Sequence, residues 1–123
     1  MKSKFLLFFA ITSVLFFTSC KKDSPAKPMV TFTGNVAEGT ANGNGEFTLT
    51  GHITSADNLS KVTLRLKGYE EPFFVDESTA QNKNEYDYSY LITGVTANIT
   101  IVMDVYTKAG GKTSVEFLIK KPV

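Results

Sequence analysis

Apolar and polar residues alternate with a period of two along most of the chain beyond residue 28. In the segment 61–67, for example, Val62, Leu64 and Leu66 alternate with charged and hydroxyl side chains. This period places the apolar side chains of an extended strand on one face, and no helical periodicity of useful length competes with it. A strand of this kind must bury its apolar face against a second sheet. The sequence therefore predicts an all-β domain.

The strand segments are short and regularly spaced, and polar or Gly-rich connections separate them. Seven segments show the alternation or a short apolar run: 30–36, 47–53, 62–66, 73–75, 86–92, 99–105 and 115–119. Turn signals lie at 39–45, 55–58, 78–84 and 108–112. Such spacing predicts an Ig-like Greek-key β-sandwich of about seven antiparallel strands over residues 29–123. The 73–75 segment follows a proline, and we expect it to be an edge strand.

The chain contains no Trp and a single Cys. The buried Trp and the inter-sheet disulfide of antibody domains are therefore excluded.

The first twenty residues read as a targeting signal. Lys2 and Lys4 give a positive start, and a mainly apolar stretch follows from Phe5 to Phe17. A membrane-spanning helix needs about 20 apolar residues, which is more than this stretch provides. We therefore interpret residues 1–19 as a signal peptide rather than a permanent span.

Phe17-Thr18-Ser19-Cys20 resembles a bacterial lipobox, in which a bulky residue and two small residues precede the Cys that is lipidated. The first position is usually Leu, so Phe17 departs from the pattern. The resemblance implies that Cys20 becomes the acylated N-terminus and that the protein is held at a membrane through its N-terminal lipid. As the only Cys in the chain, Cys20 has no partner for an internal disulfide.

Residues 20–28 are expected to form the lipidated Cys and a flexible tether. The segment after Cys20 is polar, contains two prolines and shows no apolar periodicity. Its start, Cys-Lys-Lys-Asp, looks like the start of many outer-membrane lipoproteins of the Bacteroidota. Display on the cell surface and retention on the periplasmic face both remain open.

The segment 99–120 resembles the last hairpin of bacterial Ig-like and fibronectin-III-like domains. In these domains an alternating strand, a Gly-containing turn and a Thr-Ser pair precede a second strand with Phe, as in ITIVMDVYTKAGGKTSVEFLIK. Taken with the lipobox, the whole chain resembles a small Bacteroidota-type outer-membrane lipoprotein with a single Ig-like domain.

The charge balance gives no sign of a nucleic-acid partner. The chain has 13 basic and 12 acidic residues, and loss of Lys2 and Lys4 with the signal leaves 11 against 12. A nucleic-acid footprint requires clustered basic residues, and these are dispersed. Gly43-Asn44-Gly45 lacks the Lys and the helix of a phosphate-binding loop, so no cofactor is expected.

The residues that carry hydrolytic chemistry are few or scattered. His52, the only His, lies between Thr50 and Thr54 on the expected outer face of a strand. We interpret it as a surface residue rather than as a general base. A glycosidase needs two carboxyl groups across a cleft. The middle of the chain has many carboxylates, which we interpret as charged loops: Glu70, Glu71, Asp76, Glu77, Glu85 and Asp87. We do not expect an enzyme.

Calcium is the metal that oxygen ligands in sandwich loops favour. The candidates by residue type are Asp57, Asp76, Glu77 and Asp104. They show no EF-hand or D-x-D-x-D spacing, so the sequence predicts no metal site.

Tyr86, Tyr88 and Tyr90 lie on one side of a predicted strand. The three rings form either a core stripe with hydroxyls at its rim or an exposed platform on which sugars stack. Asp87 and Ser89 occupy the other face and are poor candidates for the buried side, which favours the core interpretation.

Two functions follow from these patterns. The first is a membrane-anchored, non-catalytic Ig-like lipoprotein that serves as a binding module or as an accessory subunit of a cell-envelope assembly. The alternative is a carbohydrate-binding lipoprotein of an outer-membrane glycan-uptake system. Such lipoproteins generally have several domains and Trp-rich platforms, which this chain lacks.

Overall fold

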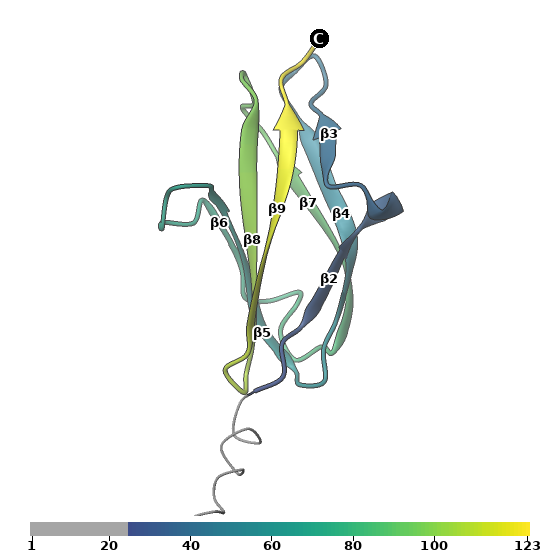
Figure 1. Cartoon of the computed structure of the whole chain (residues 1–123), viewed down its shortest axis with the longest axis vertical. Helices are drawn as coiled ribbons and strands as arrows, with labels where there is room; N and C mark the ends of the chain where they lie inside the picture. The colour runs from purple at the N-terminus through teal and green to yellow at the C-terminus, as the bar shows by residue number, and fades with distance from the viewer. Residues whose placement is uncertain (1–24) are drawn as a thin grey trace, which may run out of the picture.

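Two β-sheets pack face to face in the computed structural model, which describes residues 25–123 (Figure 1). The predicted signal peptide, 1–19, and Cys20 lie outside the described residues. The first sheet has the order β2-β4-β7, with β2 at Met29–Phe32, β4 at Phe47–Thr54 and β7 at Glu85–Ile92. The second has the order β3-β9-β8-β5-β6, with β3 at Glu38–Thr40, β5 at Leu59–Leu66, β6 at Phe74–Asp76, β8 at Ile99–Thr107 and β9 at Lys112–Lys120.

The connections between the strands cross repeatedly from one sheet to the other. The turn 55–58 leads from β4 to β5, the loop 77–84 leads from β6 back to β7, and 93–98 leads from β7 to β8. After β4, only the β5–β6 and β8–β9 connections join strands that are neighbours in the same sheet. This arrangement confirms the predicted all-β sandwich.

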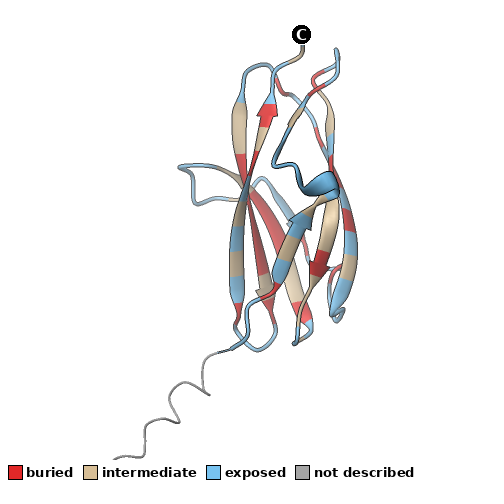
Figure 2. Cartoon of the chain, turned by 45° about the vertical axis from the view of Figure 1, so that its right-hand side comes forward, coloured by how far each residue is buried: buried red, intermediate tan, exposed pale blue. Residues whose placement is uncertain are grey.

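The core lies between the two sheets, and Figure 2 shows buried and exposed positions alternating along many of the strands. The three-stranded sheet contributes Leu49, Ile53 and Tyr88 to it. The five-stranded sheet contributes the larger set: Val62, Leu64, Ile101, Met103, Val105, Phe117 and Ile119. These are the apolar positions of the period-two pattern, which therefore identified the inner faces correctly.

The structure refines the predicted number of strands and their pairing. Eight strands occur in residues 25–123, against about seven predicted, and β3 pairs with β9 in parallel rather than antiparallel. The segment 30–36, predicted as one strand, is divided by a short 3₁₀ turn at Thr33–Asn35 that carries the chain from the first sheet to the second. Gly34 and Asn35 have φ of 71° and 57°, a conformation that Gly adopts freely and Asn tolerates.

The expected edge strand at 73–75 is confirmed with a shift of one residue. β6 pairs only with β5, with Val62 opposite Asp76 and Leu64 opposite Phe74. Pro72, which cannot donate to a ladder, lies just outside it.

The N-terminal end of the described chain lies along the β8–β9 turn. The Thr113 hydroxyl donates to the Pro28 carbonyl at 2.5 Å, and Pro28 is buried. Of the predicted tether, 20–28, the last residue is thus already packed on the domain. Within residues 25–123 we find no helix with the length and apolar character that a membrane span requires.

A close approach at Gly51 ties the three-stranded sheet together. Tyr88 lies directly opposite Gly51 across the β4–β7 ladder, and its hydroxyl donates to the carbonyl of Thr31 on β2 at 2.9 Å. The phenol therefore passes over Gly51 to reach the third strand. A Cβ at Gly51 would overlap both the Tyr88 hydroxyl and the Thr31 oxygen.

We predict that Gly51→Ala lowers the free energy of unfolding by about 2–3 kcal/mol, because Tyr88 and β2 must both move to make room for the methyl group. Urea denaturation would measure the change. Gly43→Ala is the matched control, since a Cβ there meets nothing within 4 Å, and it should change stability by less than about 0.5 kcal/mol. Equal stabilities of the two variants would contradict the proposed packing role.

Candidate functional site

The tyrosine stripe of β7 faces the core. Tyr88 and Tyr90 are only 2% and 6% exposed, and their rings stack at a centroid distance of 5.7 Å. Tyr86 is half-buried at the end of the same stripe. The structure therefore agrees with the core interpretation. The buried rings of Tyr88 and Tyr90 argue against the speculative assignment of Tyr86, Tyr88 and Tyr90 as a sugar-binding platform, because a ring packed between two sheets offers no free face for stacking.

The hydroxyls of this stripe meet Asp76, which is buried at the end of edge strand β6. Asp76 accepts hydrogen bonds from the Tyr90 hydroxyl at 2.7 Å, from the Thr79 hydroxyl at 2.5 Å, and from the backbone N–H groups of Ser78 at 3.1 Å and Thr79 at 2.9 Å. The Tyr86 hydroxyl contacts Thr79 at 2.8 Å. This Asp76 cluster joins β6 of the five-stranded sheet to β7 of the three-stranded sheet.

Hydrogen-bond donors stabilise the negative charge of the Asp76 carboxylate, and no cationic side chain within residues 25–123 forms a salt bridge with it. Burial alone would raise the pKa of Asp76, but the hydrogen bonds from Thr79, Tyr90 and Ser78 outweigh it and hold the pKa below its ordinary value. Burial and the Asp76 contact raise the pKa of Tyr90. At neutral pH Asp76 is therefore ionised and Tyr90 is protonated, so the Tyr90 hydroxyl can donate to the Asp76 carboxylate.

The other calcium candidates do not join Asp76. Asp57 lies in the β4–β5 turn, Glu77 is exposed beside Asp76, and Asp104 lies in the middle of β8. Across residues 25–123 no group of three or more His, Cys, Asp or Glu side chains is arranged to hold a metal ion.

His52 pairs with Asp87 on the outer face of the three-stranded sheet. Its Nδ1 lies 2.5 Å from an Asp87 carboxylate oxygen, and the side chains are 40% and 88% exposed. The neighbouring Thr50 hydroxyl is bonded instead to Thr33 at 2.8 Å. His52 thus occupies the predicted outer face. The remaining carboxylates are exposed: Glu70 and Glu71 lie on the β5–β6 loop, and Glu85 begins β7.

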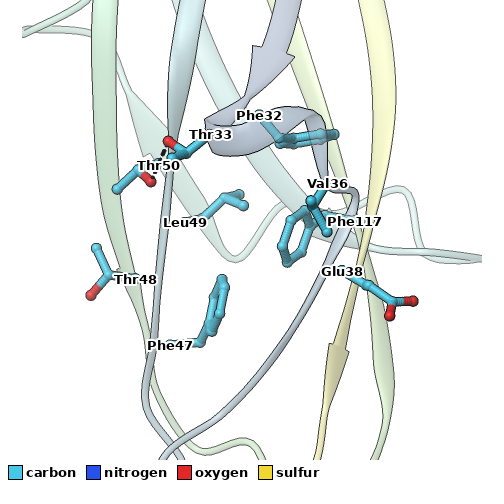
Figure 3. A pocket seen from close by; sticks show the side chains of 9 residues that line it. All are labelled: Phe32, Thr33, Val36, Glu38, Phe47, Thr48, Leu49, Thr50 and Phe117. Carbon is cyan, nitrogen blue, oxygen red and sulfur yellow. Dashed lines mark hydrogen bonds between the residues drawn. The ribbon is translucent and has the colours of Figure 1, made fainter.

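A small apolar pocket opens at the crossover between β2 and β3 (Figure 3). Its volume is about 100 Å³, and the ring of Phe117 lies 5.0 Å from that of Phe32 and 5.3 Å from that of Phe47. Such a volume is below that of typical ligand pockets. We interpret this pocket as a packing gap where the N-terminal strand changes sheets.

A larger hollow lies on the outer face of the five-stranded sheet. Its volume is about 490 Å³, within the range of small-molecule sites. The β5–β6 loop forms one wall, and in Figure 1 this loop projects from the side of the sandwich. We call this feature the outer-face hollow. Its lining residues are Lys61, Thr63, Arg65, Glu70, Pro72, Asp104, Tyr106 and Lys112.

The floor of the outer-face hollow is held by an ion pair between a buried carboxylate, Asp104, and the partly exposed Arg65. Asp104 is 2% exposed and accepts a hydrogen bond from Arg65 Nε at 2.8 Å and one from the Ser114 hydroxyl at 2.5 Å. Arg65 also donates to the carbonyl of Tyr69 at 3.1 Å and so fixes the loop wall. Burial opposes ionisation of Asp104, but the Arg65 and Ser114 hydrogen bonds hold its pKa below the ordinary value. The floor and the loop wall of the hollow are therefore held by hydrogen bonds within the chain.

Sequence reasoning did not single out this hollow. It assigned Lys61 and Arg65 to the outer side of a strand, and it considered Asp104 only as a calcium ligand. The Gly-rich turn at 108–112 was a usable signal, because it sets Tyr106 opposite Lys112. The placement of β5 beside β8, which adds Lys61 and Thr63, comes from the topology alone.

Comparison with known proteins supports the fold. The chain is similar to a solved structure of fibronectin(III)-like modules of CbhA from Clostridium thermocellum, with a TM-score of 0.54 and 22% identity over 79% of this chain and 47% of that one. The chain thus spans about half of that structure. A superoxide reductase (neelaredoxin) from Ignicoccus hospitalis has a TM-score of 0.49 and 10% identity over 81% of this chain and 84% of that one.

No family model and no curated protein match the chain. At these identities the comparisons show a fibronectin-III-like fold and nothing of activity.

We predict that Tyr88→Ala lowers the free energy of unfolding by about 3 kcal/mol or more, since it removes a buried ring and its bond to β2. Thermal or urea unfolding would measure this loss. Tyr69→Ala is the control, because Tyr69 is 64% exposed, and its effect should stay below about 0.5 kcal/mol. If the Tyr88→Ala variant were as stable as the parent, the result would contradict burial of the Tyr88 ring in the core.

We predict that Asp76→Asn costs about 2 kcal/mol near neutral pH, because the amide places donors against Thr79 and Tyr90. The folded pKa of Asp76 is lowered, so its stabilising contribution is present above the unfolded value of about 4 and is lost as the pH falls through the folded pKa. The stability gap between parent and variant should therefore narrow in acid. Urea unfolding at several acidic pH values measures this difference in stability, with Glu77→Gln as the control. A difference that stays constant with pH would contradict an ionised Asp76 in the cluster.

Proposed function

We propose that the protein is a non-catalytic binding lipoprotein of the cell envelope, anchored through Cys20 and presenting a single Ig-like domain. The observation that carries the binding role is the outer-face hollow, whose wall and floor are fixed by Arg65 and Asp104. The Asp104 side chain is buried and the Arg65 side chain is 25% exposed, so this pair holds the floor of the hollow in a fixed geometry at the surface.

The arrangement of the domain fits anchoring at one end. Residues 25–28 enter the sandwich beside the β8–β9 turn, and Met29 lies opposite Thr54, next to the β4–β5 turn. The C-terminus lies at the other end of the sandwich (Figure 1). A lipid on Cys20 would therefore place these two turns toward the membrane, and the outer-face hollow would extend from the β8–β9 turn, where Lys112 begins β9, along the side of the sandwich.

The glycan-uptake alternative loses its main support. It depended on an exposed tyrosine platform, and Tyr88 and Tyr90 are core residues. The proposal therefore favours a binding module or an accessory subunit of an envelope assembly, of the small Bacteroidota-type lipoprotein class that the lipobox and the Cys-Lys-Lys-Asp start resemble. Surface display and the periplasmic face are distinguished by protease treatment of intact cells, since only a surface domain is degraded.

We predict that Cys20→Ser abolishes lipidation and releases the protein from the membrane fraction, because the thiol is the proposed acylation site. Metabolic labelling with an alkyne-tagged fatty acid, followed by fractionation, measures both effects. Ser19→Ala keeps a small residue before Cys20 and serves as the control that should remain labelled. Fatty-acid labelling that persists in Cys20→Ser would overturn the anchor.

The binding role is tested by affinity capture of the lipidated full chain from solubilised envelope. Capture of a stoichiometric envelope protein that crosslinks to the outer-face hollow supports the proposal. Saturable binding to a glycan array with no protein partner would instead favour the alternative, while measurable hydrolase turnover abolished by Glu85→Gln would contradict a non-catalytic module.

A further inference from the structure

Two lysines of the outer-face hollow lack an acidic partner. Lys61 on β5 and Lys112 on β9 lie on either side of Tyr106 on β8, and the three form one row across the sheet. Their ammonium groups lie 4.9 and 5.4 Å from the centre of the Tyr106 ring. Neither ammonium lies within salt-bridge distance of a carboxylate anywhere in residues 25–123.

Other lysines of the same sheet are neutralised by carboxylates. Lys67 pairs with Glu116 at 3.2 Å, and Lys120 pairs with Glu38 at 3.3 Å. Lys61 and Lys112 differ from these two lysines in having no carboxylate within salt-bridge distance in residues 25–123. The hollow's own buried carboxylate, Asp104, is already bonded to Arg65 and Ser114, which leaves Glu70 on the loop as the other acid in the lining.

The aromatic ring at this place is not a free stacking surface. Cation–π contact with Lys61 and Lys112 occupies the Tyr106 ring and holds both ammonium groups at the hollow. A neutral sugar would have to displace an ammonium group to stack on the ring, whereas an anion would be attracted by both positive charges. The arrangement thus favours a negatively charged ligand group.

We propose that the outer-face hollow binds a ligand through an oxyanion group, a carboxylate, sulfate or phosphate, received beside the row formed by Lys61, Tyr106 and Lys112. This inference rests on the proposed binding role and assigns the chemistry of its ligand. Thr63 and the Arg65–Asp104 pair form the floor beneath the anion. The remaining volume, about 490 Å³ in all, accommodates the body of the ligand under the wall formed by Glu70 and Pro72.

The test titrates the full chain in non-ionic detergent micelles with inorganic sulfate, inorganic phosphate and glucuronate, and with glucose as the neutral comparison. Backbone amide NMR shifts of Thr63, Asp104 and Tyr106 report binding. At least one anion should give saturable shifts at these residues that weaken as salt rises from about 50 to about 200 mM, and glucose should give none. The ranking of the three anions identifies the oxyanion.

The decisive comparison uses two double variants of equal charge. Lys61→Gln/Lys112→Gln should weaken anion binding by about tenfold or more, while Lys67→Gln/Lys120→Gln, on the same sheet but outside the hollow, should change it by less than about twofold. Unchanged amide spectra away from the substitutions establish that both variants fold. No saturable shift with any anion, equal binding of glucose, or equal loss in both variants would overturn the inference. Cys20 labelling and envelope capture do not depend on this result.

Discussion

Burial of two apolar sheet faces against each other is the constraint from which the rest of this structure follows. Each strand carries one apolar face, and neither sheet can shield its own. The five-stranded sheet contributes mainly aliphatic side chains to the core, whereas the three-stranded sheet contributes two tyrosines beside Leu49, Ile53 and Ile92. Buried phenols bring hydroxyls that need acceptors. The Thr31 carbonyl accepts from the Tyr88 hydroxyl, and the Asp76 carboxylate accepts from the Tyr90 hydroxyl.

Two buried carboxylates perform different tasks in this framework. Asp76 lies at the end of the edge strand β6 and joins it to β7, so its charge is satisfied inside the fold. Asp104 faces outward from the middle of the five-stranded sheet, and through Arg65 it fixes the loop that walls the outer-face hollow. Both have a lowered pKa, because donors outweigh the cost of burial. A lowered pKa alone therefore does not distinguish a structural carboxylate from one that shapes a site; the direction the carboxylate faces does.

Periodicity predicted the strands well, and five of the six ladders are antiparallel as predicted. The inner positions of β4, β5, β8 and β9 follow from alternation, because side chains on a strand must point to opposite faces. Alternation alone predicts one strand over 30–36, but Gly34 and Asn35 adopt positive φ and form a turn that divides it. The parallel pairing of β3 with β9 joins segments far apart in the chain, and no local pattern encodes it.

The sequence by itself determined the all-β class, the inner faces of the strands, the turns at 55–58 and 108–112, and the resemblance of Phe17 to Cys20 to a lipobox. These depend on local spacing and residue type. Only the tertiary structure decided that the tyrosines are buried, that Asp76 and Tyr90 are partners, and that Lys61, Tyr106 and Lys112 meet in one row. The physical reason is that a β-sandwich brings distant strands together, so its polar clusters are composed across the sheets and not along the chain.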